Sequence, residues 1–315
     1  MQRPYPAPAP KGDDGPGLFL GATGGFRCRY RSPAPAANPI PLAFIDLPGP
    51  LVTATPLTAE PLAGFASLPC DCHGGAVDLP AAQQQLDGLG ALPRLAWGLD
   101  TFAAGLALTT SFGIQSAVLL HMVSELTVRS GGRPVPVIWV DTGYLPAETY
   151  RYAERLHGLL GFDLRVVQAQ ISPARMEALH GRLWESGSLE DLDFYNRLRK
   201  VEPLDRAFQD LGVRCWASGV RGGQTDHRRS MVPLEAVRGL WSLRPLLSWS
   251  RKDVFYYMEQ HGLPQHPLFE QGYSTVGDWH SSGPDDGSAS GRATRFGGLK
   301  QECGIHLPGL MGEGI

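Results

Sequence analysis

The sequence has no long apolar run and no excess of positive charge. Its apolar runs fall well short of the about 20 residues that span a bilayer, and 28 Lys plus Arg stand against 31 Asp plus Glu. We therefore expect neither a membrane protein nor a nucleic-acid binder, because the latter usually carries a positive field. Cysteine is also scarce: the 315-residue chain has five, an odd number in a chain too large to need disulfides. Together these absences predict a soluble protein of a reducing compartment, the cytoplasm.

The first 75 residues lack hydrophobic periodicity and are rich in Pro, Gly and Ala. This composition predicts a loosely ordered N-terminal extension over residues 1–75. Its few acidic residues leave a transit peptide as the alternative, although Asp13, Asp14 and the prolines disfavour an amphipathic targeting helix. Cys70 and Cys72 have no second ligand pair elsewhere, so we interpret them as incidental thiols and expect no metal site.

From about residue 104, short apolar runs alternate with helical periodicity, which is typical of a parallel α/β sheet. The predicted strands are Gly105–Thr110, Val135–Val140, Leu164–Gln168 and Cys215–Ser218. The predicted helices are Ile114–Val128, Pro146–Leu160, one beginning near Glu202, and one that Ser250 and Asp253 cap before Gly262.

This pattern predicts a doubly wound, mostly parallel sheet in a nucleotide-binding domain over residues 76–281. The Gly-, Ser- and Asp-rich stretch that follows predicts a mobile C-terminal tail over residues 282–315. Ligands of such sheets bind beyond the carboxyl ends of the strands. The loops that start at Ser111, Asp141 and Gly219 should therefore meet in one crevice.

The first of these loops has the sequence Ser111-Phe112-Gly113-Ile114-Gln115-Ser116 and lies between a predicted strand and a predicted helix. Free N–H groups at a helix N-terminus can hold a phosphate or sulfate; an ordinary turn is an equally weighted alternative. The loop resembles the PP-loop of ATP pyrophosphatases, Ser-Gly-Gly-x-Asp-Ser, but has Gln115 where that family has Asp. Loss of a carboxylate that helps to hold magnesium disfavours an ATP-dependent enzyme.

Residues 197–229 hold eight Lys or Arg against four acidic residues, a local cationic excess in a chain of net charge −3. A substrate with several phosphate or sulfate groups needs such partners. For any single arginine here, a solvated surface position is the ordinary alternative.

Read together, several motifs resemble the phosphoadenylyl-sulfate (PAPS) reductases of the sulfonucleotide reductase family. The resemblance covers about residues 95–306 and rests on Ser111–Ser116, Asp141–Tyr144, Trp184–Gly187, Lys200–Leu204, the Gly219-x-Arg221-x-x-Gln224-x-x-x-Arg228 motif and Leu299–His306. It implies an adenine nucleotide α-hydrolase-like (PP-loop) fold, a homodimer, and reduction of PAPS to sulfite and adenosine 3′,5′-bisphosphate. It also implies thioredoxin or glutaredoxin as the electron donor.

The resemblance assigns the nucleophile to Cys303, through an S-sulfocysteine intermediate. Lys300 and His306 flank it, and nearby cations raise the thiolate fraction of a cysteine. The residues expected to bind substrate are Ser111, Phe112, Gly113, Gln115, Ser116, Asp141, Thr142, Gly143, Arg182, Arg221, Gln224 and Arg228. Two departures from the family pattern are Gln301, where many relatives have a second basic residue, and Gly222-Gly223, which bears on recognition of the 3′-phosphate.

Four positions in the sequence indicate which branch of the family the chain resembles. Related adenylyl-sulfate (APS) reductases bind a four-iron cluster through cysteines, and the corresponding residues here are Tyr195, Asn196, Asp278 and Ser281. Since such clusters need thiolates, we expect no iron–sulfur cluster and no other bound cofactor. The cluster-free branch generally uses PAPS. A cluster-free APS reductase and a catalytically silent nucleotide-binding regulator remain the alternatives.

Overall fold

The structure is a computed structural model that describes residues 68–286, 291–302 and 304–306. Its centre is a six-stranded sheet in the order β3-β2-β1-β4-β6-β5. The strands are β1 (Leu106–Thr110), β2 (Val137–Asp141), β3 (Leu164–Gln168), β4 (Cys215–Ser218), β5 (Leu234–Val237) and β6 (Leu240–Leu243). All neighbouring strands are parallel except β5, which runs antiparallel to β6. The predicted doubly wound, mostly parallel α/β fold is confirmed.

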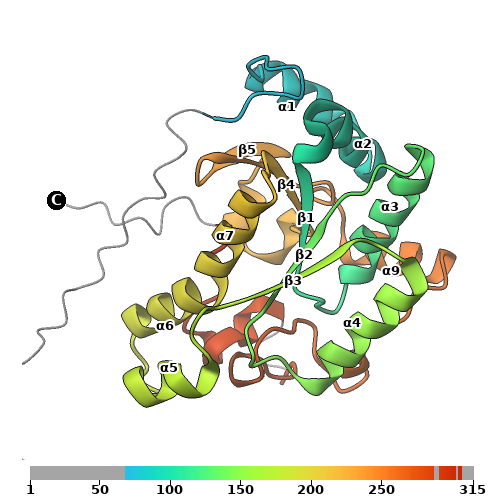
Figure 1. Ribbon diagram of the computed structural model, residues 1–315. Helices are drawn as coiled ribbons and strands as arrows, with labels where there is room; N and C mark the ends of the chain where they lie inside the picture. The colour runs from blue at the N-terminus through green and yellow to red at the C-terminus, as the bar shows by residue number, and fades with distance from the viewer. Residues whose placement is uncertain (1–67, 287–290, 303, 307–315) are drawn as a thin grey trace, which may run out of the picture. The chain divides into compact units, whose positions relative to one another are not determined.

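Helices cover both faces of this sheet (Figure 1). They are α1 (Leu79–Asp87), α2 (Ala91–Phe102), α3 (Ser116–Arg129), α4 (Ala147–Leu160), α5 (Pro173–His180), α6 (Leu189–Asn196), α7 (Glu202–Asp210), α8 (Asp226–Arg229) and α9 (Arg251–Gln260). The helices α3, α4 and α9 were predicted to within two residues of their ends, and the predicted start of α7 near Glu202 is confirmed. The capping box of α9 is also present, with Ser250 and Asp253 exchanging two hydrogen bonds. The other helices and the β5–β6 hairpin were not predicted.

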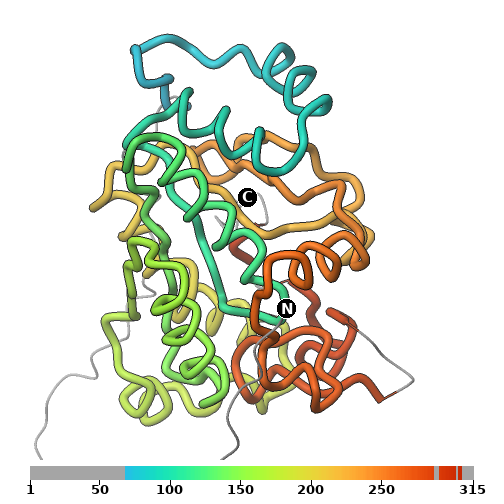
Figure 2. Tube along the Cα trace, turned by 90° about the vertical axis from the view of Figure 1, so that its right-hand side faces the viewer, coloured from blue at the N-terminus to red at the C-terminus, as the bar shows by residue number. Residues whose placement is uncertain are grey.

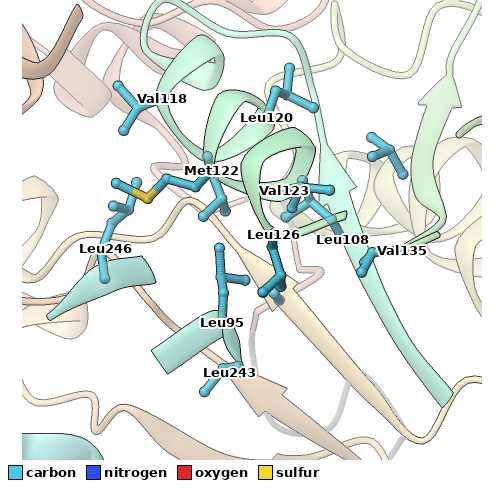
Figure 3. Packing of buried hydrophobic residues seen from close by; sticks show 14 of the residues in the cluster. Leu95, Leu108, Val118, Leu120, Met122, Val123, Leu126, Val135, Leu243 and Leu246 are labelled. Carbon is cyan, nitrogen blue, oxygen red and sulfur yellow. The ribbon is translucent and has the colours of Figure 1, made fainter. Parts of the chain in front are cut away.

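Alternate residues of each strand enter different halves of the core, as strand geometry requires. Leu106 and Leu108 pack into the larger cluster, which α1 to α4 and α9 complete; Figure 3 shows Leu108 among side chains of α3 and α2. Ala107 points to the opposite face, where α7 packs with Trp216. The central strands β1 and β4 are therefore buried on both sides, whereas the edge strand β3 is partly exposed.

The segment after α9 lies at the end of the sheet where β1 finishes (Figures 1 and 2). Part of the predicted mobile tail packs there, since Arg295 is 5% and Phe296 is 8% exposed, whereas Leu299 is 56% exposed. Residues 1–67 of the predicted N-terminal extension and the predicted nucleophile Cys303 lie outside the described residues. None of the described helices is both long and apolar enough to cross a membrane.

Candidate active site

The three loops predicted to meet do enclose a common cavity. It has a volume of about 240 Å³ and lies beyond the carboxyl ends of β1, β2 and β4. The strand order reverses between β1 and β4, which is where doubly wound sheets bind ligands. The predicted site residues that line it are Ser111, Gly113, Gln115, Ser116, Thr142, Arg221, Gln224, Arg228 and His306.

The loop from Ser111 to Ser116 presents backbone rather than charged side chains. Within the described structure no acceptor pairs with the N–H groups of Gly113, Ile114 or Gln115, which precede the 14-residue helix α3. This arrangement suits an anionic group. Phe112 differs from the prediction, because its side chain is fully buried and packs on Trp139 at 4.8 Å between ring centroids. It anchors the loop in the core and does not line the cavity.

Asp141 and Gly143 also lie outside the cavity lining. The Asp141 carboxylate accepts hydrogen bonds from Gly143 N (2.9 Å), Tyr150 Oη (2.6 Å) and Gln168 Nε2 (2.7 Å). Gly143 has φ +75°, and a Cβ there would come within 2.6 Å of the Pro173 side chain. Both residues fix the shape of the loop that carries Thr142.

Two buried arginines form the cationic wall of the cavity. Arg221 is 5% and Arg228 is 4% exposed, and they donate to the side-chain oxygens of Gln115 and Gln224. Burial, together with repulsion from Arg251 and Arg228, lowers the pKa of Arg221 to about 10. A bound anion would relieve both effects.

A carboxylate of the C-terminal segment is held against this wall. Glu302 accepts from Arg228 Nε (2.8 Å) and Nη2 (2.7 Å), lies 3.3 Å from Arg292 Nη2, and accepts from Thr225 Oγ1 at 3.2 Å. Burial opposes ionisation of Glu302, but these hydrogen bonds and charges outweigh it and hold its pKa below the usual range. The residue that precedes Cys303 in the chain is thus fixed at the cavity.

The two residues predicted to supply positive charge to the thiol behave differently. His306 stacks on Trp216 at 5.2 Å, and burial together with the charges of Arg228 and Arg292 holds its pKa well below the usual range. A lowered pKa favours the neutral imidazole near pH 7. Lys300 pairs with Asp193 and does not line the cavity.

Arg182 lies at the surface. Its guanidinium forms ion pairs with Glu177 and Glu185, and its side chain is 55% exposed. Like Phe112, Asp141, Gly143 and Lys300, it is absent from the cavity lining.

Sequence reasoning did not find a buried ion pair in the cavity wall. Lys200 Nζ lies 2.6 Å from Asp278 Oδ2, and Thr142 Oγ1 donates to the same carboxylate. Burial opposes ionisation of Asp278, yet the positive charge of Lys200 and the hydrogen bonds from Lys200 and Thr142 hold its pKa far below the usual range. Lys200 belongs to a π-helical turn, a feature frequent at functional sites. The motif that contains Lys200 indicated that this residue matters, but nothing in the sequence indicated that its partner is Asp278.

Ser218, at the carboxyl end of β4, was also missed. Its hydroxyl is buried, lines the cavity, and has no hydrogen-bond partner among the described residues. A buried polar group without a partner carries a free-energy cost that a ligand atom could remove.

The four positions that correspond to cluster ligands in APS reductases are all buried. Tyr195, Asn196 and Asp278 are fully buried and Ser281 is 2% exposed. Tyr195 Oη lies 3.0 Å from His280 Nε2. In the described ranges, no three or more His, Cys, Asp or Glu side chains are grouped so that they could hold a metal ion.

Comparisons with known proteins agree with this architecture. Residues 105–284 match the family model of the phosphoadenosine phosphosulfate reductase domain. A phosphoadenosine 5′-phosphosulfate reductase of Synechococcus sp. is 54% identical over 226 residues, which is 71% of this chain and 94% of that protein. The Synechocystis sp. enzyme of the same name is 47% identical over 74% of this chain and 92% of its own.

A solved structure is also similar. The PAPS reductase from Candida auris, crystallised as a phosphate complex, superposes with a TM-score of 0.57 at 28% identity, covering 70% of this chain and all of that one. The family model covers more than half of the chain, and the relatives from Synechococcus sp. and Synechocystis sp. are 54% and 47% identical to it. The chain belongs to the phosphoadenosine phosphosulfate reductase family.

Proposed function

We propose that this protein reduces PAPS to sulfite and adenosine 3′,5′-bisphosphate, with Cys303 as the nucleophile. One observation carries the proposal: Glu302, next to Cys303 in the chain, is bound by Arg228 in the wall of the cavity. An anion site and a segment with a candidate nucleophile therefore meet at one place. This is the arrangement that attack on a bound sulfonate requires.

The first half-reaction transfers the sulfonate to the enzyme. The Cys303 thiolate attacks the substrate sulfur, the bond between that sulfur and the phosphate oxygen breaks, and adenosine 3′,5′-bisphosphate leaves. The leaving phosphate gains negative charge, which the N–H groups of Gly113 to Gln115 are positioned to stabilise. We assign stabilisation of the thiolate to Arg228 and Arg292, because their two positive charges exceed the single negative charge of Glu302, which pairs with both.

The second half-reaction needs an external dithiol, for which we propose thioredoxin or glutaredoxin. A donor thiolate attacks Sγ of the S-sulfocysteine and releases sulfite, and the second donor thiol resolves the mixed disulfide. The donor is oxidised to a disulfide and the sulfur is reduced. No cysteine of the described residues lines the cavity, which supports an external donor. Kinetics should accordingly be ping-pong.

The family also supports three further proposals: a homodimer, a cytoplasmic location and a protein without an iron–sulfur cluster. Light scattering of the purified protein tests the first. A cluster-free APS reductase is the second candidate function, favoured by Gly222-Gly223, which places no charged side chain at these two positions of the arginine-glutamine motif.

The deciding experiment measures sulfite release from PAPS and from APS with reduced thioredoxin. We expect turnover of PAPS, and mass spectrometry without donor should find one sulfonate on the peptide that contains Cys303. Cys303→Ser should bind nucleotide and form no adduct, whereas Cys215→Ser, a change at a fully buried thiol, is the matched control. Release of sulfite by Cys303→Ser would refute the mechanism, and equal use of APS would favour the second candidate.

A further inference from the structure

A second cavity adjoins the candidate active site. It has a volume of about 260 Å³ and shares Gln115, Arg221, Gln224 and Arg292 with the first cavity as a common wall. Arg251, the first residue of α9, lines only the second cavity. The two cavities are thus adjacent and share residues of their walls.

The charges of the second cavity are not balanced. Its lining includes Arg221, Arg251 and Arg292 and contains no Asp or Glu. Among the described residues no carboxylate pairs with Arg251 or Arg221, whereas Glu302 pairs with Arg292. Repulsion from Arg251 contributes to the lowered pKa of Arg221. A dianion placed between Arg221 and Arg251 would convert this repulsion into attraction.

The proposed substrate has two separate anionic ends, the 5′-phosphosulfate and the 3′-phosphate. The sulfur must reach Cys303, and the neighbouring Glu302 is bound at Arg228, which lines only the first of the two cavities. The phosphosulfate therefore belongs to the first cavity. The second cavity remains for the 3′-phosphate, which carries nearly two charges at neutral pH.

We infer that Arg251 and Arg221 form the subsite for the 3′-phosphate and that Arg251 makes the enzyme prefer PAPS to APS. The inference rests on the proposed function and deepens it. It also answers the difficulty raised by Gly222-Gly223, because Arg251 of α9 supplies a positive charge that these two glycines lack. Phe255 and Phe269 form the apolar remainder of this cavity, against which the ribose of the nucleotide can pack.

The test compares binding of adenosine 3′,5′-bisphosphate and of AMP by calorimetry, which needs no catalysis. Arg251→Gln should weaken bisphosphate binding by at least about tenfold, the loss typical of one charged contact. AMP binding should change by less than about twofold, because AMP has no 3′-phosphate for Arg251 to contact. Lys252→Gln is the matched control, since it removes an equal charge from the adjacent exposed residue of α9, outside the cavity lining. Arg251→Lys should restore part of the affinity.

The same variants are then assayed for sulfite release from PAPS and APS. We expect Arg251→Gln to lower kcat/KM for PAPS and to leave that for APS unchanged, so that the preference falls by about the same tenfold factor. An unchanged ratio of bisphosphate to AMP affinity in Arg251→Gln, or an equal loss in Lys252→Gln, would overturn the inference. Failure of the unmutated protein to release sulfite from either nucleotide would refute the proposed function instead, whatever the binding ratios are.

Discussion

The contact between Glu302 and Arg228 gives the sharpest prediction about catalysis. Glu302→Gln keeps the size of the side chain but removes its charge and one of two acceptor oxygens. Both partners are buried, with 11% and 5% of their side chains exposed, so solvent screens the pair little. Loss of a hydrogen bond between charged groups costs about 1.5–3 kcal/mol. The fraction of molecules in which residue 302 is bound to Arg228 at the cavity should fall accordingly.

This cost converts to a decrease of about 10- to 150-fold in the rate of adduct formation, if attack requires the bound segment. The KM for PAPS should not rise, because Arg228 loses an internal competitor for substrate anions. The assay is a single turnover with PAPS and no donor, quenched and analysed by mass for sulfonated Cys303. Glu259→Gln, a change at an exposed acid of α9, is the control. Adduct formation at the unmutated rate, or a raised KM with unchanged kcat, would refute the reasoning.

Three further predictions concern stability and composition. Asp278→Asn leaves the buried Lys200 ammonium without a counter-charge and should destabilise the fold by about 3–5 kcal/mol, measured by urea unfolding; an unchanged midpoint would contradict it. The pKa of Asp278 is depressed in the folded state, so its contribution to the free energy of unfolding is fully present above the unfolded pKa of about 3.9. That contribution disappears as the pH falls toward the folded pKa. The difference in unfolding free energy between the unmutated protein and Asp278→Asn should therefore become smaller in acid. The purified protein should be colourless and free of iron by elemental analysis, and stoichiometric iron would reject the cluster-free branch. Removal of residues 1–67 should leave sulfite release nearly unchanged, since every residue of the cavity lining follows position 104; loss of folding on truncation would show that the segment is part of the domain.

The convergence of the loops was predictable because topology alone determines it. Once β1, β2 and β4 are parallel, the residues that follow them must emerge at one end of the sheet. Ser111, Thr142 and Arg221 could therefore be placed together from sequence. The short apolar runs were sufficient for this, because a buried parallel strand is apolar on both faces.

The partners of the charged groups could not be predicted. Lys200 and Asp278 are 78 positions apart, and Arg221 and Arg251 come from different elements that meet only in the folded chain. The cationic excess of residues 197–229 indicated that an anion site exists, but not which charges are already neutralised. The neutral state of His306 has the same origin, because its pKa depends on burial and on arginines that sequence does not place.

The motif around the first loop illustrates why membership in a motif does not give a residue's role. Phe112 has φ +47° and its ring enters the core, while its neighbour Gly113 lines the cavity. A hydrogen bond from Phe112 N to Thr110 Oγ1 (3.1 Å) helps to hold this turn. The aromatic ring thus determines where the N–H groups point, and its effect on an anion is indirect.

The contacts of Glu302 explain why an acidic residue can precede the proposed nucleophile in the chain. A carboxylate next to a cysteine opposes thiolate formation, since like charges destabilise one another. Here Arg228 and Arg292 both contact Glu302, so two positive charges meet one negative charge at the segment that precedes Cys303. The carboxylate can then hold the segment at the cavity without reversing the local charge. Its role depends on the arginines that bind it, and the arginines in turn need the carboxylate when no substrate anion is bound.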